Sequence, residues 1–120
     1  MKTHKDLDVW NEGIELVARV YEIVQKFPKE EKYGLVEQIK RSAVSIPSNI
    51  AEGAARNSKK EFLQFLSISL GSISELETQL IIADKLGFLK NKEIFSLIEK
   101  ERYKLLGLIR YLRSDKNVQK

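Results

Sequence analysis

The sequence predicts an all-α protein: an up-down antiparallel four-helix bundle that forms one domain over residues 1–120. Apolar residues recur at steps of three and four through four separate stretches, which is the period of an amphipathic helix. Proline, glycine and capping residues divide these stretches, and the short connections favour antiparallel neighbours. A chain of 120 residues, 42% hydrophobic and 32% charged, is large enough for one modest core.

The first helix is expected from about Asp8 to Lys26. Asp6 or Asp8 is a candidate N-cap. Pro28 is expected to end the helix, since a proline disfavours the helical conformation of the residue before it, here Phe27. The apolar positions that indicate this helix are Val9, Trp10, Ile14, Val17, Tyr21 and Val24.

The second helix follows the charged turn KEEKYG and contains an unusual stretch, SIPSNIAEGAAR, residues 45–56. This stretch can be a break between helices, a phosphate-binding loop or one bent helix. A phosphate loop is excluded, because there is one glycine and no GKS or GKT follows. The core positions keep their phase across Pro47, which favours one continuous helix kinked at Pro47. They are Val36, Ile39, Ala43, Ile46, Ile50 and either Gly53 or Ala54.

The third and fourth helices have clear end signals. Ser58 can cap the third helix with Glu61 completing a capping box, and Gly87 is a natural residue just beyond its end. Its core positions are Phe62, Leu66, Ser69, Ile73, Leu76, Leu80 and Ala83. Asn91 can cap the fourth helix, whose apolar arc is Ile94, Leu97, Ile98, Leu105, Leu108, Ile109 and Leu112. The core is expected over about residues 7–113, with a frayed basic tail at 114–120.

Two features of the third helix indicate self-association. Its middle, SISLGSIS (67–74), alternates small with apolar residues, which lets another backbone approach closely. The third helix carries Phe65, Ile68 and Ile82 away from its core positions, so it is apolar around more of its circumference than one core requires. Glu101 lies on the apolar arc of the fourth helix. It can be a proton-active site, but a buried ion pair or an oligomer contact is favoured. The candidate oligomer interface is therefore Phe65, Ile68, Ile82 and Glu101.

Composition bounds the function. There is no cysteine, no apolar run of the roughly 20 residues that a membrane span needs, and no apolar signal-peptide core at the start, so a cytoplasmic protein is expected. The net charge is +4, and its excess lies in the last quarter of the chain. Such a charge distribution is typical either of a surface that faces nucleic acid or of a soluble helix with a basic tail.

No catalytic or metal site is predicted. The one histidine, His4, is expected to be exposed and inert near the N-terminus. Without further histidine or cysteine, a di-iron site, a zinc site, a Ser-His-Asp triad and a helical ribonuclease with an Arg-x-x-x-x-His motif all lack their residues. The prediction is a non-enzyme that needs no cofactor and no metal.

A resemblance to a known family adds to this interpretation. The segment FPKEEKYGLVEQIKRSAVSIPSNIAEGAAR (27–56), followed by FLQFLSISLGSISELETQL (62–80) and ADKLGFL (83–89), resembles the bacterial four helix bundle proteins. These are also called 23S ribosomal RNA intervening-sequence proteins. The resemblance covers about residues 7–112 and implies a ring-shaped homopentamer. It also implies kinship with the accessory variability determinant of diversity-generating retroelements, a basic pentamer that binds a reverse transcriptase and nucleic acid. It supplies no catalytic residue.

The resulting hypothesis is a non-enzymatic, homo-oligomeric scaffold that binds RNA or a nucleic-acid-associated partner through basic residues, with no membrane partner. The candidate phosphate contacts are Lys40, Arg41, Arg56, Lys59, Lys60, Lys100, Lys104, Arg110 and Arg113. The alternative is a pure protein-interaction module. A polar stripe on the second helix can serve as a ligand site or, as favoured here, as an interhelical interface. It consists of Ser45, Asn49, Glu52 and Arg56.

Overall fold

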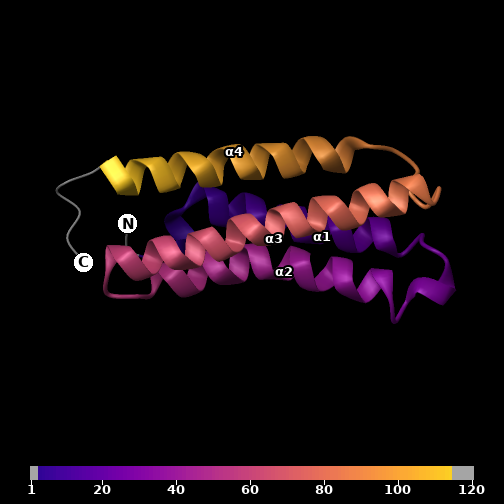
Figure 1. Cartoon of the computed structure of the whole chain (residues 1–120), viewed down its shortest axis with the longest axis horizontal. Coiled ribbons are helices and arrows are strands. Elements are labelled where there is room, and N and C mark those ends of the chain that lie inside the picture. Colours follow the sequence, from indigo (N-terminus) through magenta and orange to yellow (C-terminus); the bar gives the residue numbers. More distant parts are fainter. Residues whose placement is uncertain (1–2, 115–120) are drawn as a thin grey trace.

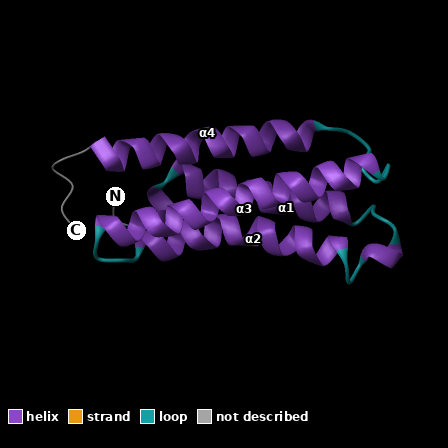
Figure 2. Ribbon diagram, viewed as in Figure 1, coloured by secondary structure: helices purple, strands orange, loops and turns teal. Residues whose placement is uncertain are grey.

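The computed structural model describes residues 3–114, and within them the fold is an antiparallel bundle of four helices without strands (Figures 1 and 2). The helices are α1 (Asp8–Val24), α2 (Leu35–Ala54), α3 (Lys59–Lys85) and α4 (Glu93–Ser114). Two short 3₁₀ turns, η1 (His4–Asp6) and η2 (Lys29–Glu31), precede α1 and α2. This confirms the predicted all-α fold.

The helices alternate in direction along an elongated body of 50 × 23 × 19 Å. The α2–α3 turn lies at one end, and the α1–α2 and α3–α4 connections lie at the other (Figure 1). Each helix packs against its two neighbours around the bundle, and no diagonal pair of described helices has Cα atoms within 8 Å of each other. The expected tail falls largely on residues 115–120, outside the described residues, whereas Ser114 is the last residue of α4.

The core face of α1 differs from the prediction. Ile14 and Tyr21, which were expected on that face, are exposed, whereas Trp10 and Val17 are half-buried. The buried positions of α1 are Val9, Gly13, Leu16, Val20 and Val24. The prediction failed because the buried face of α1 passes through Gly13. Glycine has no side chain, so it does not appear in a pattern of apolar side chains.

The N-cap prediction for α1 was also wrong. Leu7 occupies the cap position without a side-chain hydrogen bond, and Asp8 is the first helical residue. The Asp6 carboxylate instead accepts from the Thr3 backbone N–H at 3.1 Å, which completes a capping box on η1. His4 lies in that turn, half-buried, with its ring edge-on to Trp10 at 4.9 Å between centroids. His4 was expected to be exposed, but its contact with Trp10 leaves it only half-exposed.

Helix α2 runs without a break through Pro47 to Ala54, as predicted. Pro47 has no N–H to donate to the carbonyl of Ala43, a loss that costs about 3 kcal/mol in a helix interior. All the predicted core positions of α2, from Val36 to Gly53, are buried, and Pro47 is buried with them. Packing of this face therefore offsets the lost hydrogen bond.

The ends of α3 and α4 follow their sequence signals. Ser58 Oγ accepts from the Glu61 N–H at 3.0 Å. At the other end of α3, Gly87 has φ +82°, and the Phe88 N–H donates to the Ala83 carbonyl at 2.9 Å, as in a Schellman motif. Asn91 Oδ1 accepts from the Glu93 N–H at 3.1 Å at the start of α4.

Candidate functional site

The interface between α2 and α3 is polar along one edge and is held by three hydrogen bonds. Ser42 Oγ donates to Gln79 Oε1 at 2.7 Å, and Ser45 Oγ lies 2.7 Å from Ser72 Oγ. The Ser69 hydroxyl donates to the Ile46 carbonyl at 2.8 Å, one residue before the proline. These short side chains let the two backbones approach closely, and they satisfy polar groups that would otherwise be buried alone.

The polar stripe divides into a buried half and a surface half. Ser45 bonds to α3, and Asn49 Nδ2 donates to the Ser45 carbonyl and hydroxyl, each at 2.8 Å. Glu52 and Arg56 instead pair with each other at 2.9 Å on the surface. The predicted interhelical role is therefore confirmed for Ser45. Arg56 also reaches α3, where it lies 4.7 Å over the ring of Phe65 and 3.9 Å from the Glu61 carboxylate, whereas Glu52 is exposed.

Gly53 explains how the end of α2 packs against α3. A Cβ at this position would lie 2.7 Å from the Cβ of Phe65 and 3.2 Å from the carbonyl oxygen of Phe62. Both distances are too short for any larger residue unless the helices move apart. The glycine in SIPSNIAEGAAR is thus required by a close approach of two helices, and it does not form a loop.

Glu101 is the most unusual side chain of the core. It is 1% exposed, and neither carboxyl oxygen has a hydrogen-bond partner among the described residues. A Cβ built on Gly13 would lie 2.9 Å from Glu101 Oε2 and 3.4 Å from the Cβ of Pro47, so the carboxyl group lies where α1, α2 and α4 meet. Burial and the nearby charge of Glu12 raise the pKa of Glu101 to about 8.

This placement corrects the prediction that Glu101 contacts another copy or forms a buried ion pair. A side chain that is 1% exposed in the single chain cannot reach a second copy unless the bundle opens. No ion pair among the described residues includes Glu101; its neighbour Lys104 lowers its pKa only by charge at a distance. The carboxyl group is therefore neutral at neutral pH, which burial without a partner requires.

A charged cluster next to this site joins α1 to α4. Glu12 forms ion pairs with Lys100, at 3.1 Å, and with Lys104. Burial raises the pKa of Glu12, but the hydrogen bonds and charges of the two lysines outweigh it and hold that pKa below its usual value. The hydrogen bond with Glu12 raises the pKa of Lys104. The two lysines are thus engaged in packing α4 against α1.

The candidate phosphate contacts do not form one uniform set. Arg56, Lys100 and Lys104 are engaged in ion pairs, and Arg56 also lies 4.7 Å over the ring of Phe65. Lys40 lies 4.8 Å over the ring of Tyr21, and Lys59 also has a partner. No ion pair among the described residues includes the remaining four, which are Arg41, Lys60, Arg110 and Arg113. All four are exposed.

The candidate oligomer residues on α3 lie partly at the surface. Ile68 and Ile82 are 52% and 45% exposed, and Ile81, which precedes Ile82 in the chain, is 46% exposed. Phe65 is half-buried, because it also packs on Gly53. The exposed isoleucines leave apolar area on α3 that the single chain does not cover.

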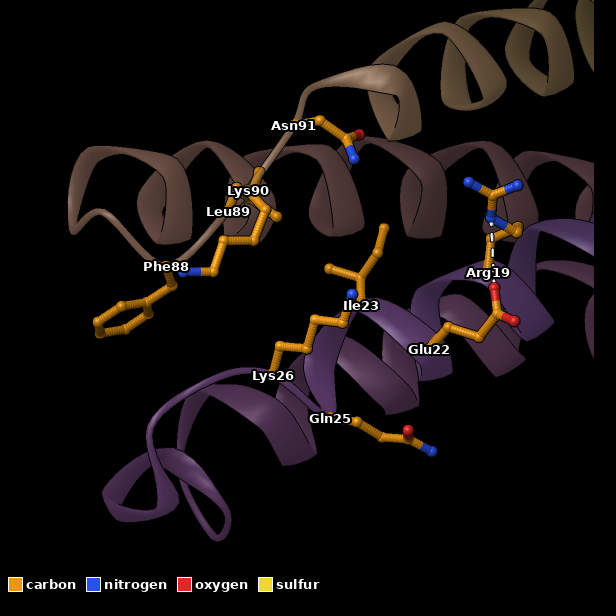
Figure 3. Close-up of a pocket in the computed structure, with 9 residues that line it drawn as sticks. All are labelled: Arg19, Glu22, Ile23, Gln25, Lys26, Phe88, Leu89, Lys90 and Asn91. Carbon is orange, nitrogen blue, oxygen red and sulfur yellow. Dashed lines mark ion pairs between the residues drawn. The ribbon is translucent and has the colours of Figure 1, made fainter.

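Several notable residues were missed from the sequence. The sequence around Glu12 and Gly13 gives no sign of their contacts with α4. Gln79 could not be distinguished by its sequence position from the other polar residues of α3. A pocket of about 380 Å³ was also missed (Figure 3). It lies between the end of α1 and the segment before α4, and it is lined by Arg19, Glu22, Ile23, Gln25, Lys26, Phe88, Leu89, Lys90 and Asn91. Lysines at a helix end are too common to have singled it out.

Among residues 3–114 there is no cluster of His, Asp or Glu that could hold a metal ion. Within the same residues, none of the helices combines the length and apolar character that crossing a membrane requires. The notable groups are a polar helix interface, a buried neutral carboxyl group and, among the candidate phosphate contacts, four exposed cations that no ion pair between described residues includes.

These features define a small helical bundle protein whose distinctive chemistry lies in its helix contacts and its charged surface. The chain belongs to the 23S rRNA-intervening sequence protein family, whose sequence model matches residues 5–107. A crystal structure of a protein of unknown function from the S23 ribosomal protein family of Bacteroides thetaiotaomicron has the same fold, with a TM-score of 0.76. It is 24% identical, and the match covers 85% of this chain and 95% of that one. No curated protein matches the chain.

Proposed function

We propose that this protein is a non-enzymatic, cytoplasmic scaffold that assembles as a homo-oligomer, a pentamer by family resemblance, and binds RNA through its basic surface. The observation that carries the proposal is the set of exposed cations without an acidic partner. From Arg102 to Ser114 the chain contains four basic residues and no acidic residue. Two of the four, Arg110 and Arg113, are exposed and unpaired at the end of α4.

These cations suit the phosphate backbone of RNA better than its bases. Single exposed arginines and lysines on helices contact phosphates and confer little sequence specificity. Each phosphate contact releases counterions, so the observed affinity falls steeply as salt rises. Repetition of the surface around an oligomer multiplies the contacts without any new residue.

Self-association is supported by the exposed apolar side chains of α3. Ile68 and Ile82 lie on the same side of one long helix, about four turns apart, and burial of apolar area is the usual driving force of assembly. Ile68→Asp places a charge in that area without touching the core. We expect this variant to remain helical by circular dichroism and to dissociate into monomers by light scattering.

The test combines mass and binding. Light scattering with and without an RNA oligomer measures the assembly and its complex, and a salt series measures the phosphate contribution. A double variant, Arg110→Gln with Arg113→Gln, is expected to bind more weakly and to flatten the salt dependence. Glu75→Gln, an exposed change on α3, is a control for folding. A wild-type monomer, or RNA binding that does not respond to salt, contradicts the proposal.

The second candidate function is a protein-interaction module without RNA binding. It is favoured by the ion pairs of Arg56, Lys100 and Lys104, which neutralise three of the nine candidate phosphate contacts. Capture of a specific protein after nuclease treatment, combined with the absence of RNA binding by the pure protein, supports this candidate over the first.

A further inference from the structure

The pocket in Figure 3 has a strong excess of hydrogen-bond donors and positive charge. We propose that it binds the phosphate group of a nucleotide, supplied either as a free nucleotide or as one unit of an RNA strand. This goes beyond the proposed function, because it places a bounded site in the single chain, at residues that do not belong to the basic surface described above.

The charge of the pocket comes from two elements of the fold. Arg19 and Lys26 belong to α1 and the turn after it, and Lys90 belongs to the segment between α3 and α4. Glu22 is the one acidic residue of the lining, and its carboxylate pairs with Arg19 Nε at 3.4 Å. No ion pair among the described residues includes Lys26 or Lys90. Two cations are therefore available to a bound anion.

Asn91 adds a neutral donor whose orientation is fixed. Its Oδ1 accepts from the Glu93 N–H at 3.1 Å, so the side-chain amide presents its nitrogen on the other side. In Figure 3 this nitrogen is directed toward the space around Ile23, and the Lys26 side chain extends to the same space from the turn after α1. A phosphate offers several acceptor oxygens to such donors, and hydrogen bonds from ionised donors are roughly twice as strong as neutral ones.

The apolar part of the lining favours a nucleotide over a bare anion. Ile23 and Leu89 are half-buried members of the lining, and they offer a surface for a sugar or a base. The Phe88 ring contacts Phe27, 5.6 Å away between centroids, and in Figure 3 it points away from the other lining side chains, so it is not placed to stack on a base in the pocket. A volume of about 380 Å³ lies within the range of small-ligand pockets and limits the site to one nucleotide unit.

The experiment is a calorimetric titration of the wild-type protein with 5′-AMP, adenosine and inorganic phosphate at low ionic strength. We expect 5′-AMP to bind with a dissociation constant of about 1 mM or tighter. Phosphate should bind more weakly, and adenosine should show no saturation. Lys26→Gln combined with Lys90→Gln is expected to weaken 5′-AMP binding about tenfold or more, since two charged contacts are lost. Glu22→Gln frees Arg19 and should tighten binding.

Lys5→Gln is the control, because it removes one exposed lysine at the opposite end of α1, outside both the pocket and the proposed RNA-binding residues. Circular dichroism checks that each variant retains its helices. Equal binding of adenosine and 5′-AMP overturns the proposal. The same is true of equal weakening by Lys5→Gln, or of no saturable 5′-AMP binding up to about 10 mM.

An RNA oligomer titrated into the same variants distinguishes the two sources of the nucleotide. If the lysine double variant weakens 5′-AMP and RNA together, the pocket holds one unit of the strand. If it weakens 5′-AMP alone, the ligand is a free nucleotide. Both results support the pocket. A wild-type chain that binds 5′-AMP but no RNA contradicts the proposed function while leaving this inference intact.

Discussion

Replacing Glu101 with Gln should change how the stability of the bundle depends on pH. Glutamine has nearly the same shape as glutamic acid but cannot ionise. In the folded chain the pKa of Glu101 is raised to about 8 from an ordinary value of 4.5, by burial first and by the charge of Glu12 second. The folded protein therefore binds a proton that the unfolded chain releases between these two pH values.

The sign and the magnitude follow from this difference. Below pH 4.5 both states hold the proton, and the wild type has the full stability of its neutral core. As pH rises from there to about 8, its free energy of unfolding falls by about 1.4 kcal/mol per pH unit, and above that the contribution is constant. The complete loss is on the order of 4 to 5 kcal/mol, a large part of a typical total of about 5–15 kcal/mol.

Urea unfolding followed by circular dichroism at pH 5.5, 7 and 8.5 measures this directly. The protein concentration is held fixed, because assembly would add to the apparent stability. We expect Glu101→Gln to have a shallower pH dependence than the wild type and to be the more stable protein at pH 8.5. Glu75→Gln, at an exposed carboxylate, should follow the wild type. Parallel pH curves for Glu101→Gln and the wild type would refute the argument that the buried carboxyl holds its proton.

Three further predictions concern contacts inside the bundle. Gly13→Ala places a Cβ 2.9 Å from Glu101 Oε2 and should lower the free energy of unfolding by about 1 to 3 kcal/mol in urea unfolding, while an unchanged value would contradict the contact. Gly53→Ala meets the side chain of α3 at 2.7 Å and should lower the melting temperature more than an alanine at the exposed, open Gly71 does. Ser45→Ala and Ser72→Ala should each destabilise by about 1 kcal/mol, with a coupling energy in a double-mutant cycle; simple additivity would mean that their hydroxyls do not interact.

The elements that the sequence predicted well are those in which local and tertiary signals agree. In α2 and α3 every expected core position is buried, because large apolar residues recur there at a constant period. The ends at Ser58, Gly87 and Asn91 also agree, since caps act over a few residues and need no knowledge of the rest of the fold.

The predictions that failed depended on which neighbour a residue meets. In α1 the large side chains of Ile14 and Tyr21 suggested a core face, but the buried face passes through Gly13, where α4 places a carboxyl group. The spacing of apolar residues along one helix indicates which side carries large side chains. It does not indicate where a neighbouring helix needs space for its own side chains. Glu101 failed for the same reason, because its surroundings come from α1 and α2, far away in sequence.

Gly13, Pro47 and Glu101 together show why the unfavourable features of this chain belong to one site. Each is weak by itself: a glycine in a helix interior, a proline that removes a hydrogen bond, and a buried acid without a partner. They meet at Gly13, because the absence of a Cβ on α1 leaves room there both for the carboxyl group of α4 and for the proline ring of α2. Restoring an ordinary residue at one position therefore need not stabilise the bundle. Alanine at position 13 collides with the carboxyl group, so its higher helix propensity of about 1 kcal/mol is outweighed unless that group also changes.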